Sequence, residues 1–246
     1  MSEALTPEAD ARTQELKRRL DAVQLRIADA TAAAGRTADP PRLIVVSKFH
    51  PADDVRRLAA LGVSDFGENR DQEASQKADV LSGLGIRWHF VGQLQSKKAK
   101  TVVRYAHAVH SVDRPQLVES LARAMAAEQE RSGRDSLDCF IQVSLDDDPA
   151  AHRGGAAPAD VPVLADQLEE AGGLRLAGVM AVAPLGADPD RAFAKLADIS
   201  ARLQASHPAA VAISAGMSQD LEAAIRFGAT HLRIGSDILG SRPAVR

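Results

Sequence analysis

LIVVSKFHPADDVRRLAALG, residues 43–62, contains a strand pattern followed at once by a helix pattern. Its first part, LIVVSK, is a short run of β-branched and apolar residues, which is typical of a buried strand. Its second part, ADDVRRLAALG, has apolar residues at helical spacing and ends at a glycine. A strand that leads directly into a helix is the repeating unit of parallel α/β proteins.

The same unit recurs along the rest of the chain. Seven further short apolar runs are separated by stretches with helical periodicity, and they lie at residues 63–67, 87–92, 108–112, 138–145, 174–182, 210–216 and 231–236. About eight strand–helix units in roughly 200 residues match a closed (β/α)8 barrel. An open doubly wound sheet usually has fewer strands and a point where the strand order reverses. The sequence therefore predicts an α/β protein with a TIM barrel over residues 40–246.

An extra helix is expected before the barrel, within residues 1–39. Over residues 7–34, apolar residues recur at intervals of three and four, which places on one helical face Leu16, Leu20, Val23 and Ile27. Thr6 can cap this helix, and Gly35 can end it. We expect the helix, its linker and the barrel to form a single domain over residues 1–246.

Composition excludes several classes of protein. The net charge is only -3 and aromatic residues make up 3 % of the chain, which argues against a nucleic-acid-binding protein. The single cysteine, Cys139, lies in the apolar run CFIQV, which predicts a buried and inert thiol suited to a reducing cytosol. Neither a signal peptide nor an apolar stretch near the ~20 residues that span a bilayer is evident. We expect a cytoplasmic protein without a membrane partner.

Two cationic residues are predicted to share the mouth of the barrel, where barrels place functional groups. Lys48 follows the first strand, and an amine held there can lose its charge and attack a carbonyl to form a Schiff base. Strand alternation places Arg233 opposite Leu232 and Ile234, so it would point into the barrel and need a partner. That partner could be a cofactor ring nitrogen or a carboxylate. The alternatives are a solvated lysine and a structural ion pair.

Two loops after the last strands have the composition of an anion cradle. One contains Ser214, Gly216, Met217 and Ser218, and the other contains Gly235 and Ser236. Gly216 would allow a close backbone approach, and Ser218 could cap the following helix so that its first amides point outward. Barrels often bind phosphate with these loops, although ordinary tight turns have similar sequences. An amine, an arginine and a phosphate cradle together fit pyridoxal 5′-phosphate (PLP).

Other polar residues near strand ends leave two interpretations open. His89 could be an acid–base group or a hydrogen-bonded core histidine. Asp113 could act in catalysis or cap the next helix. Three lysines follow Gln95, namely Lys97, Lys98 and Lys100. They could form a solvated helix face or a patch that binds an anion. The Gly- and Pro-bearing loop at 146–160 is predicted to be mobile.

In order and spacing, these motifs resemble those of the pyridoxal phosphate homeostasis proteins (YggS or PROSC type), which are single-domain relatives of the alanine racemase barrel. The resemblance extends from about residue 40 and rests on LIVVSKFHP, FGENRDQE, WHFVGQLQSKK, HSVD, GVMAVAP, ISAGMSQDLEAAI and HLRIGSDILGSR. It implies that Lys48 holds PLP as a Schiff base, that Asn69 lies near it and that Arg233 faces the pyridine nitrogen. It also assigns phosphate contacts to Ser214, Gly216, Met217, Ser218, Gly235 and Ser236. The chain departs from the family pattern at Phe49, His50, Arg70 and Lys97.

The resemblance implies a protein that buffers PLP or carries it to PLP-dependent apo-enzymes, with little or no catalysis. Alanine racemases have a second domain that supplies a tyrosine base, whereas here the only tyrosine is Tyr105, expected in the helix after the third strand. An open mouth also gives carbanions poor protection. The alternatives are a PLP-dependent racemase or lyase that uses His89 or Asp113, and a barrel for another phosphorylated ligand. We expect a monomer that binds no metal.

Overall fold

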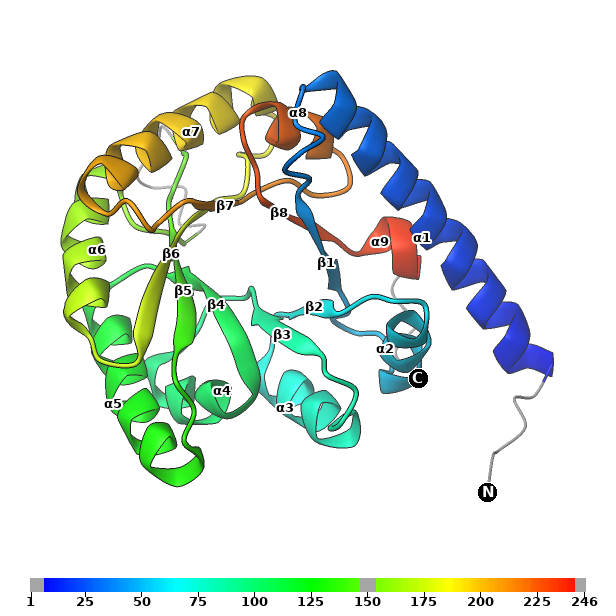
Figure 1. Cartoon of the computed structure of the whole chain (residues 1–246), viewed down its shortest axis with the longest axis horizontal. Helices are drawn as coiled ribbons and strands as arrows, with labels where there is room; N and C mark the ends of the chain where they lie inside the picture. The colour runs from blue at the N-terminus through cyan, green and yellow to red at the C-terminus, as the bar shows by residue number, and fades with distance from the viewer. Residues whose placement is uncertain (1–6, 147–153, 242–246) are drawn as a thin grey trace.

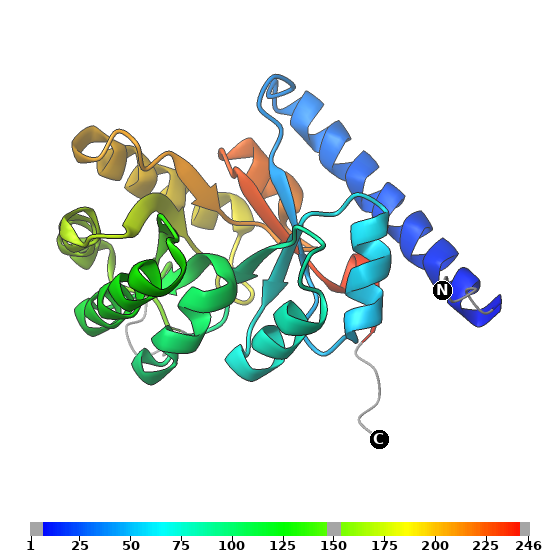
Figure 2. The same ribbon diagram turned by 60° about the horizontal axis from the view of Figure 1, so that its bottom comes forward.

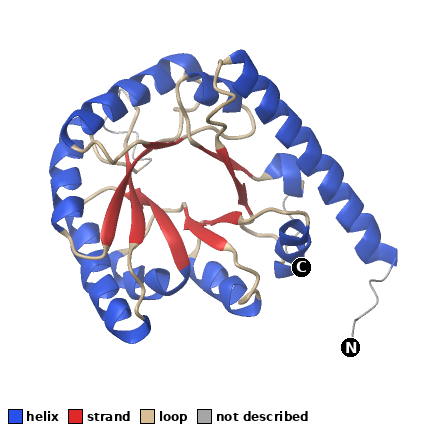
Figure 3. Ribbon diagram, viewed as in Figure 1, coloured by secondary structure: helices blue, strands red, loops and turns tan. Residues whose placement is uncertain are grey.

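Eight parallel strands close into a barrel in sequence order. The computed structural model describes residues 7–146 and 154–241. Figures 1 and 3 show the strands around the centre and the helices outside them. The strands are β1 (Arg42–Val46), β2 (Asp65–Glu68), β3 (Arg87–Phe90), β4 (Ala106–Val112), β5 (Leu137–Gln142), β6 (Leu174–Met180), β7 (Ala212–Ser214) and β8 (His231–Ile234). The predicted (β/α)8 barrel is confirmed.

A ring of helices covers the outer face of the strands, as the turned view in Figure 2 also shows. These helices are α2 (Ala52–Ala60), α3 (Asp71–Val80), α4 (Ala99–Tyr105), α5 (Pro115–Ser132), α6 (Val161–Glu170), α7 (Pro189–Ser206), α8 (Leu221–Arg226) and α9 (Ser236–Leu239), with 3-10 turns at Ser96–Lys98 and Pro158–Asp160. None of the described helices is long and apolar enough to cross a membrane.

The main core lies between the strands and this ring of helices. Leu232 and Ile234 of β8 are fully buried in it, as strand alternation predicts. Cys139 of β5 is buried in the same core, as predicted, and burial raises the pKa of its thiol. Phe140, the next residue along β5, belongs to a separate small cluster because it points to the opposite face.

The first helix, α1 (Pro7–Ala33), lies along the outside of the barrel against α2, α8 and α9 (Figure 1). The four residues of its predicted apolar face are all buried. Polar contacts add to this packing, since Arg26 donates to the carbonyl oxygen of Ser218 at 2.7 Å and pairs with Glu222. Gly35 follows the helix with a φ of +68°. The predicted cap, Thr6, lies outside the described residues.

Several strands end earlier than their apolar patterns predict. β1 stops at Val46, and Lys48 lies in the turn that follows. β5 stops at Gln142, and the chain then makes an isolated parallel bridge between Val143 and Ala156. Part of the predicted mobile loop is therefore paired with the end of a strand. Residues 147–153 of that loop lie outside the described part of the chain.

Candidate functional site

A cavity of about 910 Å³ opens at the C-terminal ends of the strands. Its lining comes from the ends of β1, β6 and β8 and from the segments after β1, β2, β3, β6, β7 and β8. Seven of the nine predicted site residues line it, namely Lys48, Asn69, Met217, Ser218, Arg233, Gly235 and Ser236. The structure therefore brings together the amine, the arginine and parts of both loops, as the strand order required.

Arg233 points into the barrel, as predicted, and is buried there. Its guanidinium donates to the hydroxyl of Ser214 at 2.7 Å and to the carbonyl oxygen of Ala181 at 2.8 Å. Burial lowers its pKa to about 10, which still leaves it protonated at neutral pH. Arg233 forms no salt bridge with any residue that the structure describes. The alternative of a structural ion pair is therefore wrong for the described part of the chain. Its charge remains available to a ligand in the cavity.

A chain of hydrogen bonds runs from Arg233 through the barrel interior. The hydroxyl of Ser214 lies 2.9 Å from His110 Nδ1, and His110 Nε2 lies 2.9 Å from His89 Nδ1. His89 Nε2 in turn lies 2.9 Å from Asp65 Oδ1. We call this series the interior relay. The direction of donation is fixed at its two ends, because arginine can only donate and an ionised carboxylate can only accept.

Two placements of protons satisfy every bond of the interior relay, and in both Arg233 donates to the Ser214 hydroxyl and His89 Nε2–H donates to Asp65. In one, Ser214 donates to His110 Nδ1 and His110 Nε2–H donates to His89, and in the other these two bonds run in the reverse direction. Burial lowers the pKa of His110 well below its usual value, so the imidazole of His110 is neutral in both placements. Burial raises the pKa of Asp65, but hydrogen bonds from His89, Arg87 and Ser64 outweigh it and keep the carboxyl ionised. His89 is thus the hydrogen-bonded core histidine that the sequence allowed.

Ser214 and Gly216 do not line the cavity. Ser214 is fully buried, and its hydroxyl is occupied by Arg233 and His110. Gly216 has a φ of +92°, and a Cβ there would lie 2.6 Å from the Cβ of Ala224. The Ser214 hydroxyl therefore lies in the barrel interior, and Gly216 allows the loop to pack closely against α8.

The predicted role of Ser218 as a helix cap is wrong. The turn after Met217 continues to Asp220, which is the N-cap residue of α8. Asp220 instead accepts a hydrogen bond from the backbone amide of Met217 at 2.6 Å. Ser218 Oγ lies 3.4 Å from Ser236 Oγ, so the hydroxyls of the two predicted loops face each other at the cavity.

The predicted acid–base candidates, His89 and Asp113, do not line the cavity. Asp113 pairs with Arg114 at 2.5 Å and does not cap α5, whose N-cap is Arg114 itself. Tyr105 ends α4, as predicted, with its hydroxyl 3.5 Å from Asp71 Oδ1. His50, which the sequence reasoning did not select, does line the cavity, and burial lowers its pKa.

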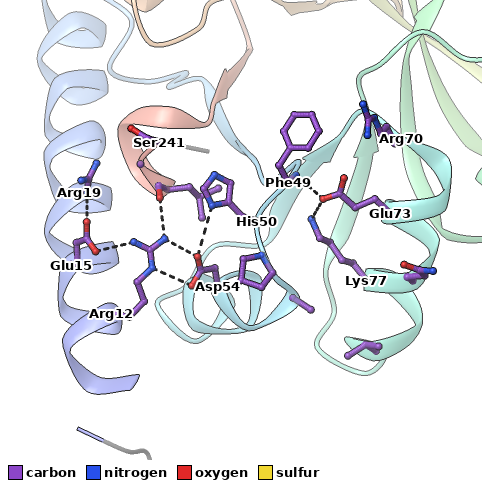
Figure 4. A pocket seen from close by; sticks show the side chains of 16 residues that line it. Arg12, Glu15, Arg19, Phe49, His50, Asp54, Arg70, Glu73, Lys77 and Ser241 are labelled. Carbon is purple, nitrogen blue, oxygen red and sulfur yellow. Dashed lines mark hydrogen bonds and ion pairs between the residues drawn. The ribbon is translucent and has the colours of Figure 1, made fainter. Parts of the chain in front are cut away.

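A second cavity, of about 1250 Å³, adjoins the first and is shown in Figure 4. It lies between α1, α2, α3 and α9, and it shares three lining residues with the first, Phe49, His50 and Gly240. On one side Arg12 of α1 donates to both carboxylate oxygens of Asp54, at 3.2 and 2.7 Å. On the other side Glu73 and Lys77 of α3 lie beside Phe49 (Figure 4). This cavity was not predicted, because its walls are far apart in sequence.

The residues of the first cavity fit PLP. Lys48 supplies an amine for the aldehyde, and the buried Arg233 supplies a cation without a salt-bridge partner among the described residues. Ser218, Gly235 and Ser236 supply hydroxyls and exposed backbone on one side. Apolar side chains that can pack on a planar ring complete the lining, among them Val46, Val91, Met180 and Val182.

The barrel and its cavity define the class of the alanine racemase N-terminal barrel, and the family model described as "Alanine racemase, N-terminal domain" matches residues 19–243. Within that class, the chain belongs to the pyridoxal phosphate homeostasis protein family. It is 44 % identical over 223 residues to the pyridoxal phosphate homeostasis protein of Corynebacterium glutamicum, covering 90 % of this chain and 99 % of the relative. The Escherichia coli protein of the same name is 32 % identical over 234 residues, covering 93 % and 97 %.

Solved structures agree with this assignment. PipY from Synechococcus elongatus, solved with PLP bound, has a TM-score of 0.78 and 34 % identity, covering 92 % of this chain and 100 % of PipY. An alanine racemase from Corynebacterium glutamicum has a TM-score of 0.64 and 17 % identity, covering 89 % of this chain and 62 % of the racemase. At that identity the racemase shows only the shared fold.

Proposed function

We propose that this protein binds PLP as a Schiff base on Lys48 and serves PLP homeostasis with little or no catalysis. The observation that carries this proposal is the cavity in which Lys48, Arg233 and the two serine- and glycine-bearing loops meet. The amine of Lys48 condenses with the PLP aldehyde to give a C=N bond and a water molecule, and hydrolysis of the same bond releases the cofactor. A reversible bond of this kind suits buffering and carriage.

Each residue of the site has a role in this proposal. Ser218, Gly235 and Ser236 hold the phosphate together with Met217, and Asn69 lies beside the cofactor. Arg233 faces the pyridine nitrogen. Because its guanidinium stays protonated, the ring nitrogen accepts a hydrogen bond without gaining a proton, and the bound ring is a weak electron sink. Ser214 and Gly216 act indirectly, by orienting Arg233 and shaping the loop.

Weak catalysis follows from the surroundings of Lys48. A racemase needs acid–base groups on both sides of the substrate carbon, and neither predicted candidate, His89 or Asp113, lines the cavity; nor does Tyr105. The rim is also open to solvent, since Leu185 is 91 % and Val182 is 44 % exposed. Water at the mouth disfavours carbanion chemistry and favours reversible release of PLP.

A racemase or lyase is the second candidate, and one observation favours it. His50 lines the cavity, is buried, and has an Nδ1 atom without a hydrogen-bond partner among the residues that the structure describes. A neutral imidazole two residues after Lys48 could move a substrate proton. Exchange of the α-proton of common amino acids with solvent D₂O, followed by NMR, distinguishes the candidates. We expect no exchange above that of free PLP, and exchange that depends on His50 would favour the enzyme.

The direct test is the visible absorption spectrum, followed by borohydride reduction and peptide mapping. We expect a yellow protein whose pyridoxyl adduct lies on Lys48, and a Lys48→Ala variant that forms none. A protein that stays colourless in excess PLP would refute the proposal and favour another phosphorylated ligand. Delivery is tested by mixing the loaded protein with a PLP-dependent apo-enzyme. We expect activity to return faster than spontaneous release of PLP allows.

A further inference from the structure

Lys48 occupies a strained turn. The backbone amide of His50 donates to the carbonyl oxygen of Ser47 at 3.0 Å, which makes residues 47–50 a four-residue turn with Lys48 second and Phe49 third. Phe49 has a φ of +68°, and it is the one non-glycine residue with a positive φ in the described part of the chain. A positive φ at the third position defines a type II turn, where glycine is preferred. A phenylalanine there is unfavourable unless its surroundings hold it.

Two residues of α3 hold this turn on both sides of Lys48. Glu73 Oε1 accepts a hydrogen bond from the backbone amide of Phe49 at 2.6 Å. The ammonium of Lys77 donates to the carbonyl oxygen of Ser47 at 2.8 Å and to Glu73 Oε1 at 2.7 Å. The peptide groups before and after Lys48 are thus joined through one ion pair. Figure 4 shows the hydrogen bonds that join Phe49 to Glu73 and Glu73 to Lys77.

Lys77 is the buried member of this ion pair, while the side chain of Glu73 is 24 % exposed. The third donor of Lys77 reaches Glu68 Oε1 at 2.7 Å, so all three of its hydrogens have acceptors. Lys77 is 6 % exposed and Glu68 is 1 % exposed. Ser47 Oγ also donates to Glu68 Oε1, at 2.7 Å. A buried ion pair adds little to the net stability of a fold, and its best-supported role is to fix one local conformation. Here the fixed conformation is that of the turn that bears Lys48.

Resting on the proposed function, we propose that Glu73 and Lys77 are positioning residues that hold residues 47–50 in the shape that directs Lys48 into the cavity. They line the second cavity and not the one that contains Lys48, so they act through the backbone rather than by touching PLP. By holding the turn, they set how readily Lys48 forms and breaks its bond to PLP. Loss of the pair should let Phe49 relax to a negative φ and move the amine away from the aldehyde.

Two ligands separate this role from general support of the fold. PLP can form a C=N bond with Lys48, whereas pyridoxine 5′-phosphate has an alcohol in place of the aldehyde and can use only the ring and phosphate contacts. We expect Glu73→Ala to weaken PLP binding by about tenfold, which corresponds to about one strained residue, and to leave pyridoxine 5′-phosphate within about twofold. The matched control is Glu15→Ala, which removes a glutamate from the opposite wall of the same cavity and should change neither affinity.

A rescue variant tests the physical cause. Phe49→Gly removes the need for a held positive φ, so the double variant Phe49→Gly/Glu73→Ala should bind PLP more tightly than Glu73→Ala alone. Glu73→Gln keeps the acceptor for the Phe49 amide and should lie between wild type and Glu73→Ala. It also replaces Glu73→Ala as the test if that variant does not fold.

Three results would overturn this inference: equal loss of both ligands, no loss of PLP affinity in the tested Glu73 variant, or no rescue by Phe49→Gly. Failure of the proposed function is recognised separately, because wild type would then give no borohydride-stable adduct on Lys48. Labelling of the PLP-free proteins with an amine reagent, mapped by mass spectrometry, gives an independent readout. The rate at Lys48 should change in Glu73→Ala and not in Glu15→Ala.

Discussion

Lowering the pH from 7.5 to 5.5 should destabilise the fold through two histidines of the barrel interior. His110 is fully buried and stacks on Phe140 with ring centroids 4.1 Å apart, and burial lowers its pKa well below 6.5. Burial also lowers the pKa of His231 to about 3. The charged and titratable groups that act on these rings are His89, His107, Arg42, Asp65 and Arg233.

The sign of the effect follows from proton uptake. Below a pH of about 6.5 the unfolded chain protonates both histidines, while the folded protein keeps them neutral. The unfolded state therefore binds more protons, and the contribution to stability that is present above pH 6.5 is lost as the pH falls. At pH 5.5 each histidine with a strongly lowered pKa removes about 1.4 kcal/mol, so the two together remove about 3 kcal/mol from the free energy of unfolding.

Urea unfolding at the two pH values measures this loss. Trp88 is the only tryptophan and is buried, so its fluorescence should follow unfolding. His231→Gln removes one of the two titrating rings and should roughly halve the loss, while His207→Gln, a change at the end of α7 outside the barrel interior, should leave it as in wild type. Equal free energies of unfolding at both pH values, or a full loss in His231→Gln, would refute the reasoning.

Three other variants or treatments test separate features. Gly178→Ala should cost at least about 3 kcal/mol in urea unfolding, because its Cβ would lie 1.9 Å from the carbonyl oxygen of Ala212 at a φ of +151°. Ser214→Ala removes the acceptor that orients Arg233 and should weaken PLP and pyridoxine 5′-phosphate alike, as titrations of each ligand would show. Cys139 should react with a thiol reagent only after denaturation, because it is fully buried and burial raises its pKa.

The barrel was predictable because its signals are local. Strand and helix periods alternate along the chain, and short connections leave few other arrangements for them. The ends of the strands were less predictable, since the apolar run of β1 continues to Lys48 in the sequence. In the structure Ser47 begins a turn that side chains of α3 hold through hydrogen bonds. The pattern of apolar residues cannot predict such contacts.

The site was predictable where strand alternation decides it. Alternation placed Arg233 toward the cavity, and the structure agrees, while Lys48 reaches the same cavity from the turn after β1. Contacts across the barrel were not predictable in the same way. His110 meets Ser214 over a separation of 104 residues, and no single strand reveals that pairing. The sequence did show polar residues at inward-facing positions of buried strands. Such a residue needs a hydrogen-bond partner, but its position in the sequence does not identify that partner.

The interior relay gives the barrel its own spectroscopic probe. The nitrogen atoms of His89 and His110 lie in series between Arg233 and Asp65, shielded from solvent, and each tautomer depends on its neighbours. A ligand that interacts with the guanidinium of Arg233 would change the strength of each hydrogen bond along the interior relay. Nitrogen-15 chemical shifts of these two rings would then report occupancy of the cavity without a dye, a tag or any change to the site itself.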